Sequence, residues 1–370
     1  KNRWWYVKAN GIFSRVEGSR KAILETQTGF VHLFQRSNAA YLGVDSTRTS
    51  LTGTGGTVRI GKTGGNPGSN GGIFKFESGV TWRSPELELN DIGFLLSSDQ
   101  INHFTWAGYQ IQKPFSVFRN WRINYNHWVR WDFGGRLLFT GFNTNTHAWF
   151  KNNWSIGTGM NWNPLVISNN ALRGGSSLRR PATINNWAYV ETDGRKTVSF
   201  SVNTYFAWGF EHTLRAQEYS FGVNVQPFDA LRVGFYPSYS RSWRKQDQFV
   251  DQVDFGAQRR TIVSEVEERN FSVTARLTYN ITPDLTVQYY AQPFIFRALY
   301  KNFGYVTDPL NKNFDDRFLL LIQLKISFCL VLNFLLLITT QMYEHYFNCQ
   351  VFFQLFFIYA SLLYFYEWGF

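Results

Sequence analysis

The sequence predicts an all-β protein, built as an antiparallel, up-and-down, transmembrane β-barrel. Three observations predict this class. Apolar and polar residues alternate with a period of two, short turns alternate with longer loops, and aromatic residues make up 19% of the 370 residues. A strand with one lipid-facing side alternates in this way, and aromatic girdles at both membrane interfaces need many such side chains.

The alternation is clearest between Phe271 and Ile281, where every second residue is apolar or aromatic and the residues between them are polar. Thr282-Pro283-Asp284 follows as a tight-turn sequence, and a second alternating run begins at Leu285. This pattern predicts a hairpin with one apolar and one polar face. Similar runs predict fourteen strands, over residues 2–16, 21–35, 51–62, 71–84, 101–113, 119–133, 141–150, 153–163, 185–192, 195–209, 217–226, 230–243, 259–281 and 284–300.

The connections between these strands also alternate in length. Short turns are expected near 17–20, 64–70, 113–118, 150–153, 192–195, 227–230 and 282–284. Longer loops are expected at 36–50, 85–100, 134–140, 164–184, 210–216, 244–258 and from 301 onward. Outer-membrane barrels have short periplasmic turns and longer outer loops. Because the first connection is read as a turn, one strand is expected before Lys1 and a closing strand after residue 317, about sixteen in total.

The composition excludes several other classes. The net charge is +11, but the basic residues are spread along alternating segments without a recognition helix, so no nucleic-acid partner is expected. The only cysteines are Cys329 and Cys349, and the six histidines have no ligand spacing. We therefore expect no metal, no cofactor and no catalytic residues.

The barrel is expected to occupy residues 1–317, truncated at its N-terminal side, and 318–370 to form an aberrant hydrophobic tail. Solid apolar runs replace the alternation after Arg317. Three interpretations of this tail stay open: translation in a shifted reading frame, membrane helices such as Phe318–Ile338, and an unusual natural end.

Several motifs resemble a known family. They include Trp82-Arg83-Ser84-Pro85-Glu86-Leu87-Glu88-Leu89-Asn90-Asp91, Trp131-Asp132-Phe133-Gly134-Gly135, Ala171-Leu172-Arg173-Gly174-Gly175 with Leu178-Arg179-Arg180-Pro181, and Tyr290-Ala291-Gln292-Pro293-Phe294. In order along residues 1–317, they resemble the Bacteroidetes-type outer-membrane barrel family called domain of unknown function 5916. The resemblance implies a bacterial outer-membrane location and a preceding periplasmic domain, missing here, that is similar to family-9 carbohydrate-binding modules. It implies no established activity.

Two charged loops are candidate ligand sites on the outer side. Glu86, Glu88 and Asp91 could bind a cation or protonate a glycosidic oxygen, although a loop folded into the lumen and held by hydrogen bonds explains them as well. Arg173, Arg179 and Arg180 could bind a sugar acid or lipopolysaccharide phosphate. The alternative is that these arginines pair internally with the acidic loop.

The polar faces of the strands predict the residues that line the interior. These are Arg83, Arg122, Arg130, Asp132 and Arg276, which are expected to form ion-pair ladders around a watery lumen.

Three functions are compatible with these features. The first is an outer-membrane barrel that binds or passes a carbohydrate or another polar solute, with membrane lipid and lipopolysaccharide around it. The second is an anchor that docks the periplasmic domain. The third is an outer-membrane hydrolase with an acidic outer-loop site.

Overall fold

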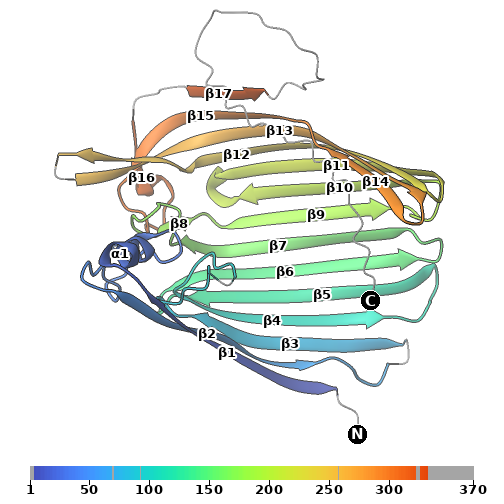
Figure 1. Ribbon diagram of the computed structural model, residues 1–370, viewed down its shortest axis with the longest axis horizontal. Coiled ribbons are helices and arrows are strands. Elements are labelled where there is room, and N and C mark those ends of the chain that lie inside the picture. Colours follow the sequence, from blue (N-terminus) through green and yellow to red (C-terminus); the bar gives the residue numbers. More distant parts are fainter. Residues whose placement is uncertain (1–3, 69–70, 92, 257, 322–325, 332–370) are drawn as a thin grey trace, which may run out of the picture.

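The computed structural model describes residues 4–68, 71–91, 93–256, 258–321 and 326–331, which form one antiparallel sheet (Figure 1). Its one α-helix is α1 (Arg20–Thr28), and two 3-10 turns lie at Phe210–His212 and Asp315–Arg317. The strands are β1 (Trp5–Glu17), β2 (Ser50–Lys62), β3 (Gly72–Arg83), β4 (Gln100–Ile111), β5 (Phe118–Trp131), β6 (Leu137–Phe150), β7 (Ser155–Ser168), β8 (Leu178–Arg180), β9 (Thr183–Glu191), β10 (Val198–Gly209), β11 (Leu214–Phe228), β12 (Leu231–Phe255), β13 (Gln258–Thr282), β14 (Leu285–Ala291), β15 (Phe294–Val306), β16 (Phe318–Leu320) and β17 (Ile326–Val331).

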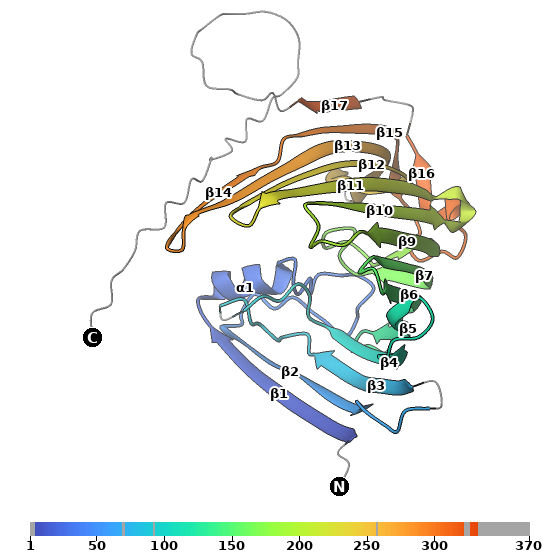
Figure 2. The same cartoon turned by 90° about the vertical axis from the view of Figure 1, so that its right-hand side faces the viewer.

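The strands follow one another in up-and-down order. Each long strand pairs with the next one along the chain, β7 pairs with both β8 and β9, and β15 pairs with β16 and β17. Figure 2 shows that the sheet curves strongly and that α1 lies inside the curve. The sheet therefore has a concave face, which α1 covers in part, and a convex face.

Strand register sorts the side chains between these two faces. Leu51 is fully buried in a cluster with Ile23 of α1, so its side of β2 belongs to the concave face. Pairing carries this assignment from strand to strand. On β10, for example, Val202 lies on the convex face opposite Val190, whereas Asn203 lies on the concave face opposite Tyr189.

The convex face is apolar and exposed. Large exposed side chains on it include Val58, Ile123, Ile156, Met160, Val190, Val202, Phe221, Phe235 and Phe271. Polar groups interrupt this face in places, as where Ser78 Oγ lies 3.1 Å from His103 Nε2 and 2.9 Å from Thr105 Oγ1, and where Asn186 Nδ2 donates to Thr158 Oγ1 at 3.3 Å. Such hydrogen bonds lower the cost of placing polar side chains on an apolar surface.

Glycines on the concave face leave room for large aromatic rings. A Cβ added at Gly159 would lie 2.7 Å from the Trp187 ring, and one added at Gly157 would lie 2.4 Å from Tyr189. Both rings belong to the neighbouring strand β9, and a ring that covers a cross-strand glycine stabilises that position. Small residues are thus required where the aromatic rings of the interior lie flat on the sheet.

The prediction of a strand at 21–35 is wrong, because residues 20–28 form α1. Ser19 caps the helix by accepting a hydrogen bond from the backbone N of Ala22. Ile23 and Gln27, four residues apart, are the two buried residues of the helix. The alternation that suggested a strand is weaker than this helical spacing and cap.

This correction changes the strand count. β1 runs directly into the long connection 18–49 and is not followed by a short turn. The first connection therefore lies at the end of the sheet that carries the longer loops, which we call the loop end. The inference of a strand before Lys1, and the total of about sixteen, depended on that turn. The predicted loop 244–258 is also mostly strand, because β12 extends to Phe255, and the predicted strand 284–300 divides into β14 and β15 at Gln292-Pro293, since proline lacks a backbone N–H.

The predicted tail begins with two short strands. β16 and β17 pair antiparallel with β15, where hydropathy also allowed a helix. Residues 332–370 lie outside the described residues, so the boundary at 317 stays a prediction. No helix in the described part of the chain is long and apolar enough to cross a membrane.

Candidate functional site

A chain of side-chain amides crosses the concave face from β4 to β9. Each member donates to the oxygen of the next, and the chain runs from Trp106 Nε1 to Asn124 (3.1 Å), Asn145 (2.7 Å), Asn143 (2.5 Å), Asn161 (2.8 Å) and Asn185 (2.6 Å). We call these six residues the amide chain. Asn126 joins it from the side, because its Nδ2 donates to Asn143 Oδ1 at 2.9 Å.

Register brings these residues together. Asn143 of β6 lies directly opposite Asn161 of β7, and Asn161 lies directly opposite Asn185 of β9. Directly paired residues in a sheet have Cβ atoms about 5 Å apart, which suits a hydrogen bond between two short amides. β5 and β6 each carry two asparagines in an Asn-x-Asn pattern, so Asn124 lies opposite Asn145 and Asn126 lies opposite Asn143.

A cavity of about 320 Å³ opens beside the amide chain toward the loop end. Arg130 is its one charged lining residue, and the guanidinium donates through Nε to Asn102 Oδ1 at 2.6 Å. The same guanidinium lies 5.5 Å from the centre of the Phe139 ring. The lining residues are Asn102, Trp128, Val129, Arg130, Phe139, Asn161, Asn163 and Asn185.

Four of the residues predicted to line the interior lie on the concave side of strands. Arg122 stacks on Trp149 at 5.1 Å, Arg276 on Tyr290 at 5.2 Å, and the register places Arg83 opposite Gly55. The fifth, Asp132, lies just beyond β5, is buried, and accepts a hydrogen bond from the backbone N of Arg136.

The expected ion-pair ladders are wrong for these five residues, since none of them forms an ion pair with another residue in the described ranges. Amides and aromatic rings take the place of acids. An amide oxygen accepts a hydrogen bond from the guanidinium and an aromatic ring attracts the cation, but neither neutralises its charge.

The segment 18–49, which we call the inner segment, folds against the loops that close the same end of the sheet. Arg36 of this segment forms a buried ion pair with Asp99, with 2.5 Å between Nη2 and Oδ2. Tyr41 donates its hydroxyl to the same carboxylate at 2.6 Å, and the backbone N of Phe133 donates at 3.0 Å. One aspartate therefore joins the inner segment to two outer loops.

The predicted acidic loop also binds the inner segment. Glu86 accepts hydrogen bonds from Nη1 and Nη2 of Arg48, at 2.9 and 2.7 Å, and from the backbone N of Thr52, at 3.0 Å. Burial by itself would raise the pKa of Glu86, but the hydrogen bonds from Arg48 and Thr52 outweigh it and lower the pKa. Glu86 is therefore a structural anion, held in its charged form.

The other two acidic candidates differ from Glu86. Glu88 lies beside His32 of the inner segment, with 3.8 Å between Oε2 and Nε2. His32 is buried, and this burial lowers its pKa despite the nearby carboxylate. Asp91 is exposed on the surface of the loop. The three acids therefore do not converge on one point.

The three basic candidates are held by separate contacts. Arg173 lies 4.6 Å above the Phe249 ring, Arg179 donates its backbone N to Pro309 O at 2.8 Å, and Arg180 Nε lies 3.5 Å from Asp247. Within the described ranges no ion pair joins these arginines to Glu86, Glu88 or Asp91, so the internal pairing we considered is wrong.

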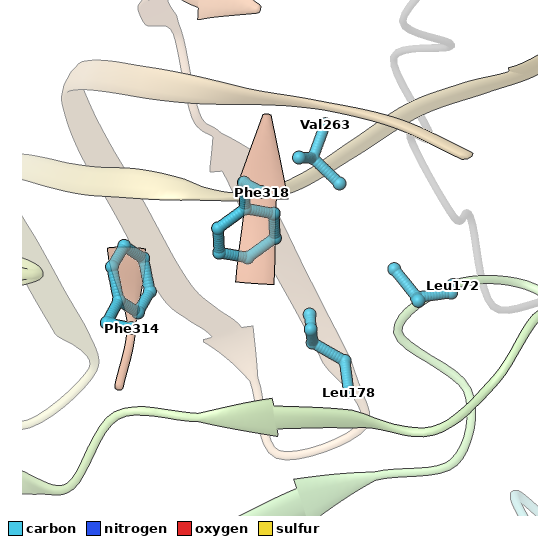
Figure 3. Close-up of a cluster of buried hydrophobic side chains, with 5 residues drawn as sticks. All are labelled: Leu172, Leu178, Val263, Phe314 and Phe318. Atoms are coloured by element: carbon cyan, nitrogen blue, oxygen red, sulfur yellow. The ribbon is translucent and has the colours of Figure 1, made fainter. Parts of the chain in front are cut away.

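A buried apolar cluster fixes this basic loop to the end of the sheet. Figure 3 shows Leu172 and Leu178 of the loop beside Val263 of β13, Phe314 and Phe318. Arg317 lies next to it and donates to three backbone oxygens, among them Arg179 O at 2.7 Å. The loop is therefore packed rather than free to extend.

Sequence reasoning missed the two best-organised features. Apart from Trp106, the amide chain consists of ordinary asparagines, and only register shows that they face one another. Arg36 and Arg48 lie in residues 36–50, which were expected to form a long loop without assigned contacts. The repeated Asn-x-Asn of residues 124–126, 143–145 and 161–163 was the signal that could have found the amide chain.

This geometry defines the class of protein: an all-β protein with one amphipathic, up-and-down sheet and a polar concave face. The chain belongs to the family described as "Domain of unknown function (DUF5916)", which its sequence matches over residues 24–313. No curated protein and no solved structure matches the sequence.

Proposed function

We propose that this chain is an outer-membrane β-barrel protein that binds or passes a carbohydrate or another polar solute along its concave face. The observation that carries the proposal is the inverted polarity of the sheet. The exposed convex face is apolar, whereas the concave face holds the amide chain and the arginines. A water-soluble sheet normally turns its apolar side toward a core, and a membrane barrel turns it toward lipid.

Strand length supports the same proposal. β4 has 12 residues, and β5, β6 and β7 have 14 each. A tilted strand needs roughly 9–11 residues to cross the hydrocarbon layer. On the convex side, Arg241 forms an ion pair with Glu267 (2.8 Å) and is the eleventh residue of β12, at the limit of such a span.

The chemistry of the concave face suggests the solute. Primary amides both donate and accept hydrogen bonds, as sugar hydroxyls do, and aromatic rings offer flat apolar surfaces. Asn161, Asn163 and Asn185 lie together with Trp128 and Phe139 around the cavity. A polyhydroxylated solute can use both kinds of surface at once.

The position of the inner segment favours a second candidate function, an anchor that docks a periplasmic carbohydrate-binding-like domain. The buried pair of Arg36 and Asp99 holds this segment within the curve of the sheet, where it narrows any path along the concave face. In this proposal the protein has no enzymatic activity. Lipid and lipopolysaccharide surround the barrel in both versions.

The test is swelling of liposomes that contain the purified full chain. Swelling in maltose or raffinose, together with single-channel conductance, is the result that we expect of a solute pathway. Liposomes that carry inserted protein but neither swell nor conduct would contradict the pathway and leave the anchor. A protein that does not enter liposomes at all would contradict both membrane functions.

A further inference from the structure

We propose that the cavity beside Arg130 binds an acidic oligosaccharide, with a sugar carboxylate on the Arg130 guanidinium and sugar hydroxyls on Asn161, Asn163 and Asn185. This inference rests on the proposed function and adds the chemical class of the ligand and its site. No carboxylate lines the cavity in the described residues, and its eight lining residues include four asparagines and two aromatic residues.

Arg130 carries a charge that no acid of the described residues neutralises. Its Nε is used by Asn102, and its guanidinium plane packs near Phe139. The positive charge of Arg83 acts on Arg130 as well. A guanidinium in such a place offers its two terminal nitrogens to a planar anion, and a carboxylate accepts them in a bidentate geometry.

The amide chain ends at this cavity with an unused donor. Its five hydrogen bonds run head to tail, four of them from strand to strand between β4 and β9 and one along β6, and Asn185 accepts the last of them through Oδ1 (2.6 Å). Within the described residues, Asn185 takes part in this chain only as an acceptor, so its amide nitrogen is the unused donor. Hydrogen bonds in a head-to-tail chain polarise one another, so the terminal N–H group of Asn185, which lines the cavity, is a strengthened donor.

The remaining walls suit the carbon skeleton of a sugar. Trp128 is 38% exposed and Phe139 lies on the neighbouring strand, so each offers an apolar surface to C–H groups. The volume of about 320 Å³ is at the lower end of the range for small-ligand sites, which suits one or two sugar rings of a longer chain. An acidic sugar therefore finds a cation, amides and aromatic surface in one cavity.

The experiment measures binding to the full chain in detergent micelles by calorimetry. The probe is hexagalacturonate, and its fully methyl-esterified form is a match of equal length without charge. Arg130→Gln removes the cation. Arg122→Gln is its control, because it makes the same change on the same strand and face but outside the cavity. Asn185→Asp keeps the acceptor for Asn161 and replaces the free donor by an anion.

We expect hexagalacturonate to bind, and its methyl ester to bind about tenfold or more weakly, since a charge-assisted hydrogen bond contributes about one order of magnitude or more. Arg130→Gln and Asn185→Asp should each weaken binding of hexagalacturonate about tenfold, and Arg122→Gln should leave it unchanged. Thermal unfolding of each variant shows that the fold is intact, and Asn185→Asp tests the site even where Arg130→Gln does not fold.

Equal binding of the acid and its ester would overturn the assignment of an acidic sugar. Absence of hexagalacturonate binding, or equal affinities of wild type and Arg130→Gln, would overturn the site. Insertion of the same protein preparation into liposomes is measured separately. Failed insertion contradicts the membrane function, whereas failed sugar binding by a protein that inserts contradicts this site alone.

Discussion

Arg36 and Asp99 form an ion pair in which both side chains are 2% exposed, and it joins the inner segment to the loop between β3 and β4. Removal of one partner leaves a buried charge without compensation, which costs about 3–5 kcal/mol. Arg36→Met should therefore lower the opening free energy of residues 18–49 by about that amount. Hydrogen exchange of these amides measures it.

Arg48→Met provides the matched control, since the Arg48–Glu86 pair is about 30% exposed on both sides. An exposed pair contributes about 1 kcal/mol or less, so this variant should change exchange only slightly. Equal effects of the two substitutions would contradict the role assigned to Asp99.

Acid should loosen the inner segment in two steps. Burial lowers the pKa of His32 below its ordinary 6.5, so the unfolded segment takes up a proton first and stability falls as the pH drops below 6.5. Arg48 and Thr52 lower the pKa of Glu86 below its ordinary 4.5 despite burial, so its contribution is present above 4.5 and is lost as the pH falls further.

Hydrogen exchange of residues 18–49 between pH 7 and pH 3.5, corrected for the intrinsic exchange rate, measures both steps. His32→Gln should abolish the upper step and Glu86→Gln the lower one. Protection that is independent of pH in the wild type would show that neither group is linked to the inner segment.

Gly53 lets the loop after β3 lie directly on β2. A Cβ at this position would lie 2.2 Å from the backbone N of Leu87, and backbone cannot move aside as a flexible side chain does. Gly53→Ala should destabilise the protein by about 1–3 kcal/mol through overpacking. Gly11→Ala is the control on the neighbouring strand, since nothing lies within 4 Å of its added Cβ. Denaturant unfolding should separate the two variants.

Val202 and Asn203 are consecutive residues on opposite faces of β10, and Val202 is 45% exposed. Val202→Arg would place a cation in lipid and should cost about 2–4 kcal/mol near the middle of the bilayer. Asn203→Arg points to the polar concave face and should cost little. Unfolding from lipid vesicles measures both, and a neutral Val202→Arg would indicate that its face meets water.

The sequence predicts the strands well where one face is apolar and the other polar. The alternation from Phe271 to Ile281 lies within β13, and the hairpin turn at Thr282–Asp284 is confirmed. It predicts less well where tertiary packing decides. Residues 21–28 show a weak alternation that suggests a strand, but the burial of Ile23 against Leu51 stabilises a helix instead.

In the candidate site, too, the sequence predicts what strand period decides and misses what tertiary packing decides. The concave positions of Arg122, Arg130 and Arg276 follow from strand period alone. Their partners do not, because a partner on the next strand depends on register, which a bulge of one residue alters, as between Thr140 and Phe142. The contacts of the amide chain depend on this register, and its Asn-x-Asn repeat was the one sign of them in the sequence. The Arg36–Asp99 pair joins two loops, to which strand period does not apply.

The most direct test of a lipid-facing convex surface is a quenching scan along β10. Cys329 and Cys349 are the only cysteines, so a chain with both replaced by serine accepts one fluorescent label at a time at positions 200 to 204. We predict that labels at 200, 202 and 204 are quenched by a lipid-bound quencher in vesicles, and labels at 201 and 203 by aqueous iodide. Uniform quenching by iodide at all five positions would contradict the membrane-spanning account.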